Sequence, residues 1–482
     1  MKGFGFALAA SAYLRESPDG FYLVSRLPFR LLRVNGSLFR LLRYIRDGGG
    51  LAGFTKENPG FDEPRLLHIL LSLAAGGYLR LERIAELESY PFVSIIIPVR
   101  DQTRDLADCL ASLAEMDYPE ELRETIVVDD GSKKDISRIL TSDRFKYIRL
   151  EKSQGPAAAR NAGAGKAGGD ILAFLDADCV AGEKWLRETV PFFNADGVGV
   201  VGGRVEGFYK KRFLDRYEAA FSSLNMGNRL ILEDKSNSTF YVPTANLLVR
   251  RDVFTALGGF REVMRTGEDV DFCWRLRDSG RALLYAPFGA VAHKHRRQLD
   301  RMLSRRFQYG MSEAPLYHAH RDKKKTLSIP VFSGLSLLAI TLAILLVNPY
   351  PLCAVPVLFE LNLWRRAAAV KKLKIDAGFG RLASAAAKSH LSFCYFAFFH
   401  VARYYLILFI GLGVLWYPLW ILGGLALVYA SVADYLIKRP ALFYPVFIFF
   451  YLAEHLVYHA GVFWGCLKKG YFGSYAVKFR IT

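Results

Sequence analysis

Paired cysteines are missing from this 482-residue sequence, which has six cysteines but no Cys-x-x-Cys pair and no zinc-type spacing. The cysteines stand at positions 109, 179, 273, 353, 394 and 466. Neither a structural zinc site nor a dithiol redox centre is therefore indicated. We expect reduced, mostly buried thiols, as in a protein of the cytosol or of a membrane.

Long apolar runs are absent before residue 326, although 52% of all residues are hydrophobic. Because these runs all come later, we expect a soluble front part and a membrane-associated back part. The basic–aromatic modules of nucleic-acid-binding domains are also missing, so no nucleic-acid partner is expected. The net charge of +18 fits either simple solubility, or attraction to anionic lipid headgroups and a polyanionic substrate.

No catalytic cluster is apparent in residues 1–88. The apolar segment 3–14 is too short to span a bilayer and runs into a charged turn, which favours a first strand over a targeting segment. Further predicted elements are strands at 21–24 and 78–81 and helices at 37–45, capped by Ser37, and at 63–73. They predict a small winged-helix-like α+β domain that serves binding or packing.

Residues from 93 onward alternate between short apolar runs and helical patterns. Apolar runs of this length are typical of strands that are buried on both faces. The predicted strands are 93–100, 125–130, 147–150 and 171–175, and the predicted helices are 106–113, 136–140 and 155–165. This β-α-β succession predicts an α/β domain with a parallel, doubly wound sheet.

Polar and charged side chains gather where the predicted strands end. They are Pro98, Arg100, Asp129, Asp130, Asp176 and Asp178. Open α/β sheets bind ligands at the carboxyl ends of their strands. Carboxylates spaced like Asp176 and Asp178 suit Mg²⁺ or Mn²⁺ on a diphosphate, although an isolated Asp-x-Asp also fits a plain acidic turn.

With the motif Ala159-Arg160-Asn161, these strand ends make residues 92–312 resemble a family 2 glycosyltransferase with the nucleotide-sugar-binding GT-A fold. The donor-binding residues implied by the resemblance are Pro98, Arg100, Asp129, Asp130, Arg160, Asn161, Asp176 and Asp178. The acid after the second strand would hold the base or ribose. The Asp-x-Asp pair would hold the ribose and the metal.

Two acids and two histidines follow on the acceptor side. Glu268 and Asp269 precede a helical pattern that begins at Val270, where the helix dipole favours ionised carboxylates, so an acidic cap is one explanation. The resemblance implies that Asp269 is the general base for a sugar hydroxyl and that Glu268 orients the acceptor. It also implies that His293, with His295 in reserve, completes the metal shell.

A tryptophan is absent where processive polysaccharide synthases carry Gln-x-x-Arg-Trp. The matching residues are Gln298, Arg301 and Met302, so the aromatic platform for a growing chain is missing, which disfavours synthesis of a long polymer. Arginines concentrated over 296–306 fit either the leaving diphosphate or a membrane surface.

The tail, residues 326–482, predicts a membrane-associated helical region with two to four spans. The predicted elements are a span at 327–347, a basic interfacial helix at 365–390, a hairpin or bent helix at 404–436, and an interfacial or bundle-facing helix at 442–467. The basic segment places the protein at the cell membrane with its catalytic domain on the cytoplasmic side.

The layout of front domain, GT-A domain and tail resembles the glycosyltransferases of the mycofactocin system, with tail motifs at 433–440 and 458–466. This implies transfer of glucose from UDP-glucose to the precursor of mycofactocin, which is a peptide-derived redox cofactor. The product would be a short β-linked oligosaccharide. Residues 1–88 would then resemble a peptide-recognition module. The alternatives are a lipid-linked or cell-envelope polysaccharide acceptor and, more remotely, a metal-dependent nucleotidyltransferase.

Overall fold

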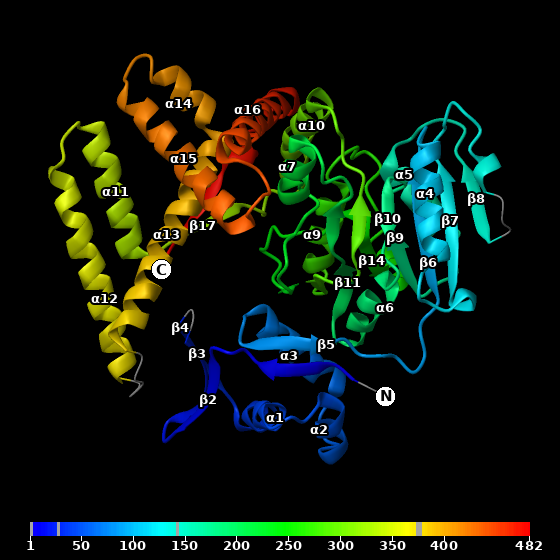
Figure 1. Cartoon of the computed structure of the whole chain (residues 1–482), viewed down its shortest axis with the longest axis horizontal. Helices are drawn as coiled ribbons and strands as arrows, with labels where there is room; N and C mark the ends of the chain where they lie inside the picture. Colours follow the sequence, from blue (N-terminus) through cyan, green and yellow to red (C-terminus); the bar gives the residue numbers. More distant parts are fainter. Residues whose placement is uncertain (1–2, 27–28, 141–143, 373–377) are drawn as a thin grey trace. The chain divides into compact units, whose positions relative to one another are not determined.

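The structure is a computed structural model that describes residues 3–26, 29–140, 144–372 and 378–482 (Figure 1). The chain forms two compact units. The first comprises Met1–Tyr22 and Val34–Arg296, and the second comprises Leu23–Arg33 and Arg297–Thr482. The expected boundaries near residues 88 and 312 stay predictions.

The N-terminal part of the first unit is a small α+β assembly. Its elements, together with two strands shared with the second unit, are β1 (Gly5–Leu8), β2 (Ala12–Ser17), β3 (Gly20–Arg26), β4 (Phe29–Val34), α1 (Gly36–Arg46), α2 (Leu51–Glu57), α3 (Glu63–Ala75) and β5 (Leu79–Arg83). The apolar segment 3–14 thus contributes to two strands. The cap of α1 is Asn35, whose side chain accepts from the Leu38 N–H at 2.8 Å, so the prediction of Ser37 as the cap was wrong.

The larger, α/β part of the first unit is built on an eight-stranded sheet in the order β13-β15-β11-β14-β9-β6-β7-β8 (Figure 1). The strands are β6 (Val93–Val99), β7 (Arg123–Asp129), β8 (Phe145–Arg149), β9 (Ile171–Phe174), β11 (Val198–Gly202), β13 (Ile231–Glu233), β14 (Leu247–Arg250) and β15 (Ala282–Tyr285). The strands β6, β7, β8 and β9 are mutually parallel, as predicted.

The sheet as a whole is mixed, which corrects the prediction of a parallel sheet. β14 runs antiparallel to both β9 and β11, and β13 runs antiparallel to β15. The apolar pattern of a buried strand is the same in either direction, so periodicity does not reveal this reversal.

Helices and short strands complete this α/β part. The helices are α4 (Thr103–Ala114), α5 (Pro156–Ala164), α6 (Trp185–Thr189), α7 (Phe213–Phe221), α8 (Arg251–Ala256) and α9 (Glu268–Asp278). A small second sheet joins β10 (Cys179–Ala181), β16 (Val291–His293) and β12 (Val205–Gly207). The helix predicted over 136–140 is only a 3-10 turn, Ser137–Ile139.

Close packing of α5 on the sheet fixes the helix that carries the Ala-Arg-Asn motif. A Cβ at Gly163 would lie 2.6 Å from Ile96 Cγ2 and 3.0 Å from Val128 Cγ2. Ala157 and Ala159 are also buried against the sheet side. The small residues of α5 therefore bring this helix close to β6 and β7, and Arg160 reaches Asp176 just after β9.

The second unit is mainly helical. Its elements from residue 297 onward are α10 (Leu299–Ala319), β17 (Lys325–Ile329), α11 (Val331–Leu345), α12 (Ala354–Lys372), α13 (Phe379–Tyr404), α14 (Leu406–Leu412), α15 (Pro418–Lys438), α16 (Tyr444–Lys469) and β18 (Val477–Ile481). β17 pairs with β18 in parallel, and α11 and α12 lie side by side as a hairpin (Figure 1).

Two helices of the described tail, α15 and α16, are long and apolar enough to cross a membrane. The pair α13 and α14 is bent by 72° and forms a third candidate if it is one span. The predicted span at 327–347 was wrong, because its start forms β17 and the helix that follows, α11, has only 15 residues. The predicted interfacial helix at 365–390 is divided between α12 and α13, and residues 373–377 lie outside the described residues.

The interior of the helical unit contains buried charge. Glu454 on α16 pairs with Arg403 on α13 at 3.1 Å and with Arg306 on α10 at 3.3 Å. All three groups have little exposed side-chain surface. These ion pairs connect α16 with α13 and α10, and they place Glu454 inside the bundle, one of the two positions expected for it.

Candidate active site

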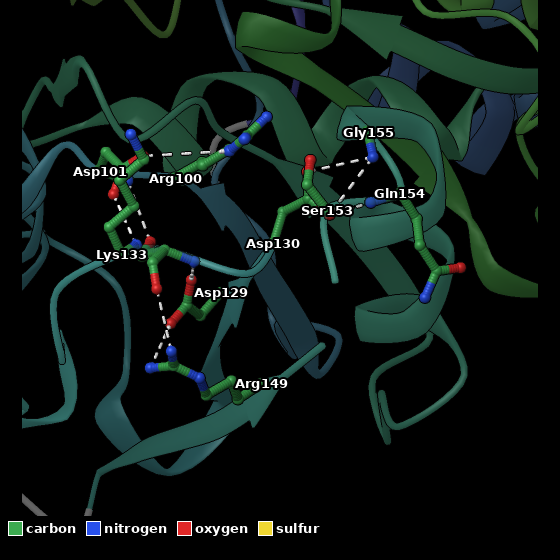
Figure 2. A network of polar contacts seen from close by, with 10 residues as sticks. Arg100, Asp101, Asp129, Asp130, Lys133, Arg149, Ser153, Gln154 and Gly155 are labelled. Carbon is green, nitrogen blue, oxygen red and sulfur yellow. Dashed lines mark hydrogen bonds and ion pairs between the residues drawn. The ribbon is translucent and has the colours of Figure 1, made fainter. Parts of the chain in front are cut away.

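Asp129 lies at the end of β7 and organises the loop that follows (Figure 2). Its buried carboxylate accepts from the Ser132 N–H at 2.7 Å and from the Tyr147 hydroxyl at 3.0 Å. Arg149 on β8 pairs with the same carboxylate at 3.2 Å. The charge of Asp129 is thus balanced within the protein.

Asp130 holds the loop that leads into α5 (Figure 2). It accepts from the Ser153 hydroxyl at 2.7 Å and from the N–H groups of Gln154 and Gly155 at 2.7 and 3.0 Å. Both acids therefore shape the edge of the sheet through contacts with neighbouring loops. The contact with base or ribose stays a prediction for either one.

The loop after β6 is fastened to the loop after β7. Asp101 has a positive φ of 56°, which is uncommon for a residue other than glycine. Its N–H donates to Ser132 Oγ at 2.9 Å, and its carboxylate accepts from the Lys133 N–H at 2.8 Å. Arg100 extends from this loop with 54% of its side chain exposed, while Pro98 lies opposite Val128 in the sheet.

Arg160 connects the two acid pairs predicted from the sequence. Its guanidinium contacts Asp176 Oδ1 at 2.6 Å and Glu268 Oε1 at 2.8 Å. Burial would lower the pKa of Arg160, but the charges of Asp176 and Glu268 outweigh it and raise the pKa. The structure thus brings together acids that are 92 positions apart (268 − 176), a connection that no local pattern indicates.

Asp178 faces a different set of partners. Its Oδ1 lies 3.4 Å from His293 Nε2, and its Oδ2 accepts from Gln102 Nε2 at 3.4 Å. Burial raises the pKa of Asp178; His293 opposes this rise and Asp176 adds to it. Gln102 was not predicted, because a single glutamine in a loop carries no recognisable signal.

The two candidate histidines have different acidic neighbours. His293 ends β16 beside Asp178, whereas His295 lies 3.5 Å from Asp215, which is buried in α7. Between them, Lys294 donates its N–H to the Asp178 carbonyl at 2.9 Å and its ammonium to Asp105 on α4 at 3.0 Å. Lys294, which follows β16, therefore links the end of this strand to α4, a contact that sequence reasoning missed.

Asn161 on α5 makes three side-chain hydrogen bonds. Its amide contacts the backbone N–H and carbonyl of Phe260 at 2.9 and 2.8 Å and the Glu262 carboxylate at 3.0 Å. These residues belong to the loop that precedes α9.

Asp269 lies in the first turn of α9, where its Oδ1 accepts from the Val270 N–H at 2.8 Å. Burial and the neighbouring charge of Glu268 raise the pKa of Asp269 to about 7, although the Val270 N–H and Arg160 oppose the rise. A carboxyl group of this pKa is ionised in part at neutral pH and has enough basicity to accept a proton. Its environment thus fits the role of general base.

The residues around Asp178 have the chemistry of a divalent-metal site. A carboxylate and an imidazole lie side by side, and a second aspartate is two positions away. No three His, Cys, Asp or Glu side chains converge as a ready-made site within the described ranges. The set Asp176, Asp178 and His293 therefore fits a metal by its donor atoms, and its joint use as ligands stays a prediction.

A mixed α/β sheet with an Asp-x-Asp pair at its edge, joined through Arg160 to a second acid pair on α9, defines an enzyme of the GT-A glycosyltransferase class. The profile of Glycosyl transferase family 2 matches residues 94–258. The chain is also 34% identical over 343 residues to the pre-mycofactocin glycosyltransferase of Mycobacterium tuberculosis, covering 70% of this chain and 67% of that protein. The chain belongs to glycosyltransferase family 2.

Two further proteins show how far the similarity extends. The glycosyltransferase AglE of Haloferax volcanii is 33% identical over 238 residues, which cover 48% of this chain and 76% of that protein. The solved mannosyltransferase PcManGT of Pyrobaculum calidifontis, a complex with GDP-Man and Mn²⁺, is 18% identical with a TM-score of 0.42, covering 68% of this chain and 99% of that one. Family membership favours sugar transfer over the nucleotidyltransferase alternative.

Proposed function

We propose that the protein is an inverting hexosyltransferase that moves a sugar, with glucose from UDP-glucose as the first choice, to the peptide-derived precursor of mycofactocin. The observation that carries the proposal is the Arg160 bridge, which holds the donor-side Asp176 and the base-side Glu268 in one site. The acceptor is taken from the similarity to the pre-mycofactocin enzyme. A short β-linked oligosaccharide is the proposed product.

The proposed chemistry is a single displacement. The acceptor hydroxyl oxygen attacks the anomeric carbon, the bond from that carbon to the diphosphate oxygen breaks, and the nucleoside diphosphate leaves with the electron pair. Asp269 accepts the hydroxyl proton during the attack, which needs its ionised form. Attack from the face opposite the leaving group inverts the anomeric carbon without a covalent enzyme intermediate.

Donor binding is assigned to the edge formed by β6, β7 and β9. Arg100 is exposed there and carries a permanent charge that suits a diphosphate or base carbonyl. Asp129 and Asp130 hold the surrounding loops in shape, and Asp176 lies beside Arg160 at the same edge. A bound Mg²⁺ or Mn²⁺, held by Asp178 with His293 and Asp176, would neutralise charge on the leaving diphosphate.

We further propose that the protein is associated with the cell membrane through its helical unit, with the catalytic unit on the cytoplasmic side. Support comes from the length and apolar surface of α15 and α16 and from large exposed apolar side chains such as Trp420, Phe449 and Trp464. These helices are also the specific observation that favours a second candidate acceptor, a lipid-linked or cell-envelope glycan.

A transfer assay separates the candidate acceptors. Purified full-length protein is incubated with UDP-glucose and either the mycofactocin precursor or a polyprenyl-phosphate-linked sugar, and the products are read by mass. The proposal expects hexose additions to the peptide-derived compound. Additions to the lipid-linked acceptor alone would replace it with the second candidate, and a panel of other nucleotide sugars tests the choice of donor.

A further inference from the structure

The side-chain hydrogen bonds of Asn161 go to the loop between α8 and α9. Its Oδ1 accepts from the Phe260 N–H at 2.9 Å, and its Nδ2 donates to the Phe260 carbonyl at 2.8 Å and to Glu262 at 3.0 Å. An asparagine amide has two N–H donors, and both are used here. The side chain thus bonds to both backbone groups of Phe260, as a neighbouring strand would. These two bonds are called the clasp below.

Two glycines in this loop leave room for the Asn161 side chain to approach the backbone closely. Gly258 and Gly259 both have positive φ values, 72° and 67°. A Cβ at Gly259 would lie 2.7 Å from Asn161 Oδ1, so a side chain there would push against the amide. Only a residue without Cβ adopts this backbone at low cost and admits Asn161 this closely.

The helix α9 holds the same loop through a second set of contacts. Arg275 donates to the carbonyls of Leu257 and Gly259 at 2.6 and 2.7 Å. Asp271, fully buried, pairs with Arg261 at 3.1 Å and with Arg275 at 2.8 Å. The loop between α8 and α9 is therefore held between Asn161 and the helix that carries Asp269.

We propose that Asn161 is a positioning residue for the general base, acting through the loop of residues 257–267, and is not a contact of the sugar-nucleotide donor. This inference rests on the proposed function, in which Asp269 is the base. The family resemblance implies the opposite assignment, with Asn161 beside the nucleotide. The two assignments differ in which kinetic constant depends on the side chain.

Substitution of Asn161 by Ala tests the assignment in the full-length protein. Loss of the clasp lets the loop and the N-terminus of α9 shift, and a displacement of about 1 Å at a catalytic group lowers turnover by about 10–100-fold. We expect kcat to fall by that factor, while the Kd of UDP by calorimetry and the KM of the donor stay within about threefold. Asn58→Ala, which also removes an amide-to-carbonyl bond, at 2.9 Å to Phe54, is the matched control with kcat unchanged.

A double-mutant cycle shows whether the effect passes through Asp269. In an Asp269→Asn background the base is already lost, so Asn161→Ala is expected to lower the residual turnover by less than about threefold. Gly259→Ala provides a second test that leaves Asn161 in place. It is expected to lower kcat in the same way, because the new Cβ displaces the clasp.

Two results would overturn the inference while leaving the proposed function intact. One is an Asn161→Ala protein that loses UDP affinity tenfold or more with kcat preserved. The other is equal loss of turnover from Asn161→Ala in the wild-type and Asp269→Asn backgrounds. A wild-type protein that transfers no sugar from any nucleotide sugar would instead overturn the proposed function and this inference with it.

Discussion

Asp269 and Glu268 are adjacent acids with different surroundings. Glu268 is buried and pairs with Arg160 at 2.8 Å, directly before Asp269 in the chain. Burial and the charge of Glu268 together raise the pKa of Asp269 to about 7. Because the proposed base must be ionised to accept a proton, kcat/KM should fall as the pH drops through this value.

Glu268→Gln tests the influence of the neighbouring charge. The amide oxygen still accepts from Arg160, but the negative charge that raises the Asp269 pKa is gone. We expect the acid limb of the pH profile of kcat/KM to move about one pH unit lower. An unchanged limb in a variant with normal donor KM would show that Asp269 does not control this part of the profile.

Asp178→Asn tests the metal assignment without relying on turnover. Replacing the carboxylate by an amide removes a charged ligand, so the affinity for Mn²⁺ should fall by about 10–100-fold. The free Mn²⁺ signal in electron paramagnetic resonance measures this directly. Asp47→Asn, which removes an exposed carboxylate paired with Arg46 in the N-terminal part of the chain, is the control. Undiminished Mn²⁺ binding by Asp178→Asn would remove this residue from the ligand set.

At the level of residues, the sequence was informative where a charged residue follows a buried strand directly. Asp176 and Asp178 could be selected because charge directly after a buried strand is hard to explain by packing. The partners could not be predicted in the same way. Arg160 meets Glu268, and Lys294 meets Asp105, only through contacts between distant segments.

At the level of elements, parallel strands β6 to β9 followed from alternating apolar and helical patterns. Strand direction in the second half did not, because β14 has the same apolar composition in either orientation. The start of the tail was misjudged for a related reason. The uncharged segment from Leu327 contains part of β17, which pairs with β18 about 150 residues later. A hydropathy profile carries no information about such strand pairing.

The packing of α5 on the sheet gives a paired test of these elements. Gly163→Ala places a Cβ against Ile96 and Val128, whereas a Cβ at Gly165 meets only carbonyl oxygens at 3.5 Å or more. We expect Gly163→Ala to lower the free energy of unfolding of the catalytic unit by about 1–3 kcal/mol and Gly165→Ala to change it by less than about 1 kcal/mol. Thermal unfolding measures both. Equal effects would show that α5 does not press on β6 through Gly163.

For the whole molecule, the decisive property is the coexistence of a GT-A unit with an apolar helical unit. If α15 and α16 cross the bilayer, the protein should remain in membranes washed with high salt and with alkaline carbonate. Attachment by the excess of basic residues alone would be lost in high salt, because screening weakens exposed charge attraction. Release by salt would therefore contradict the spanning assignment.

The number of spans was not predictable from hydropathy, since helices such as α16 combine apolar surface with buried Glu454.

The most direct test of the central claim is the mass of the product formed from UDP-glucose and the mycofactocin precursor by wild-type protein and by Asp269→Asn. The wild type is expected to add hexose units with inverted configuration, read by NMR of the isolated product. Asp269→Asn is expected to lose about 10²–10⁴-fold in turnover while binding UDP normally. A wild type that leaves every tested acceptor unmodified, or an Asp269→Asn protein with unchanged turnover, would contradict the account.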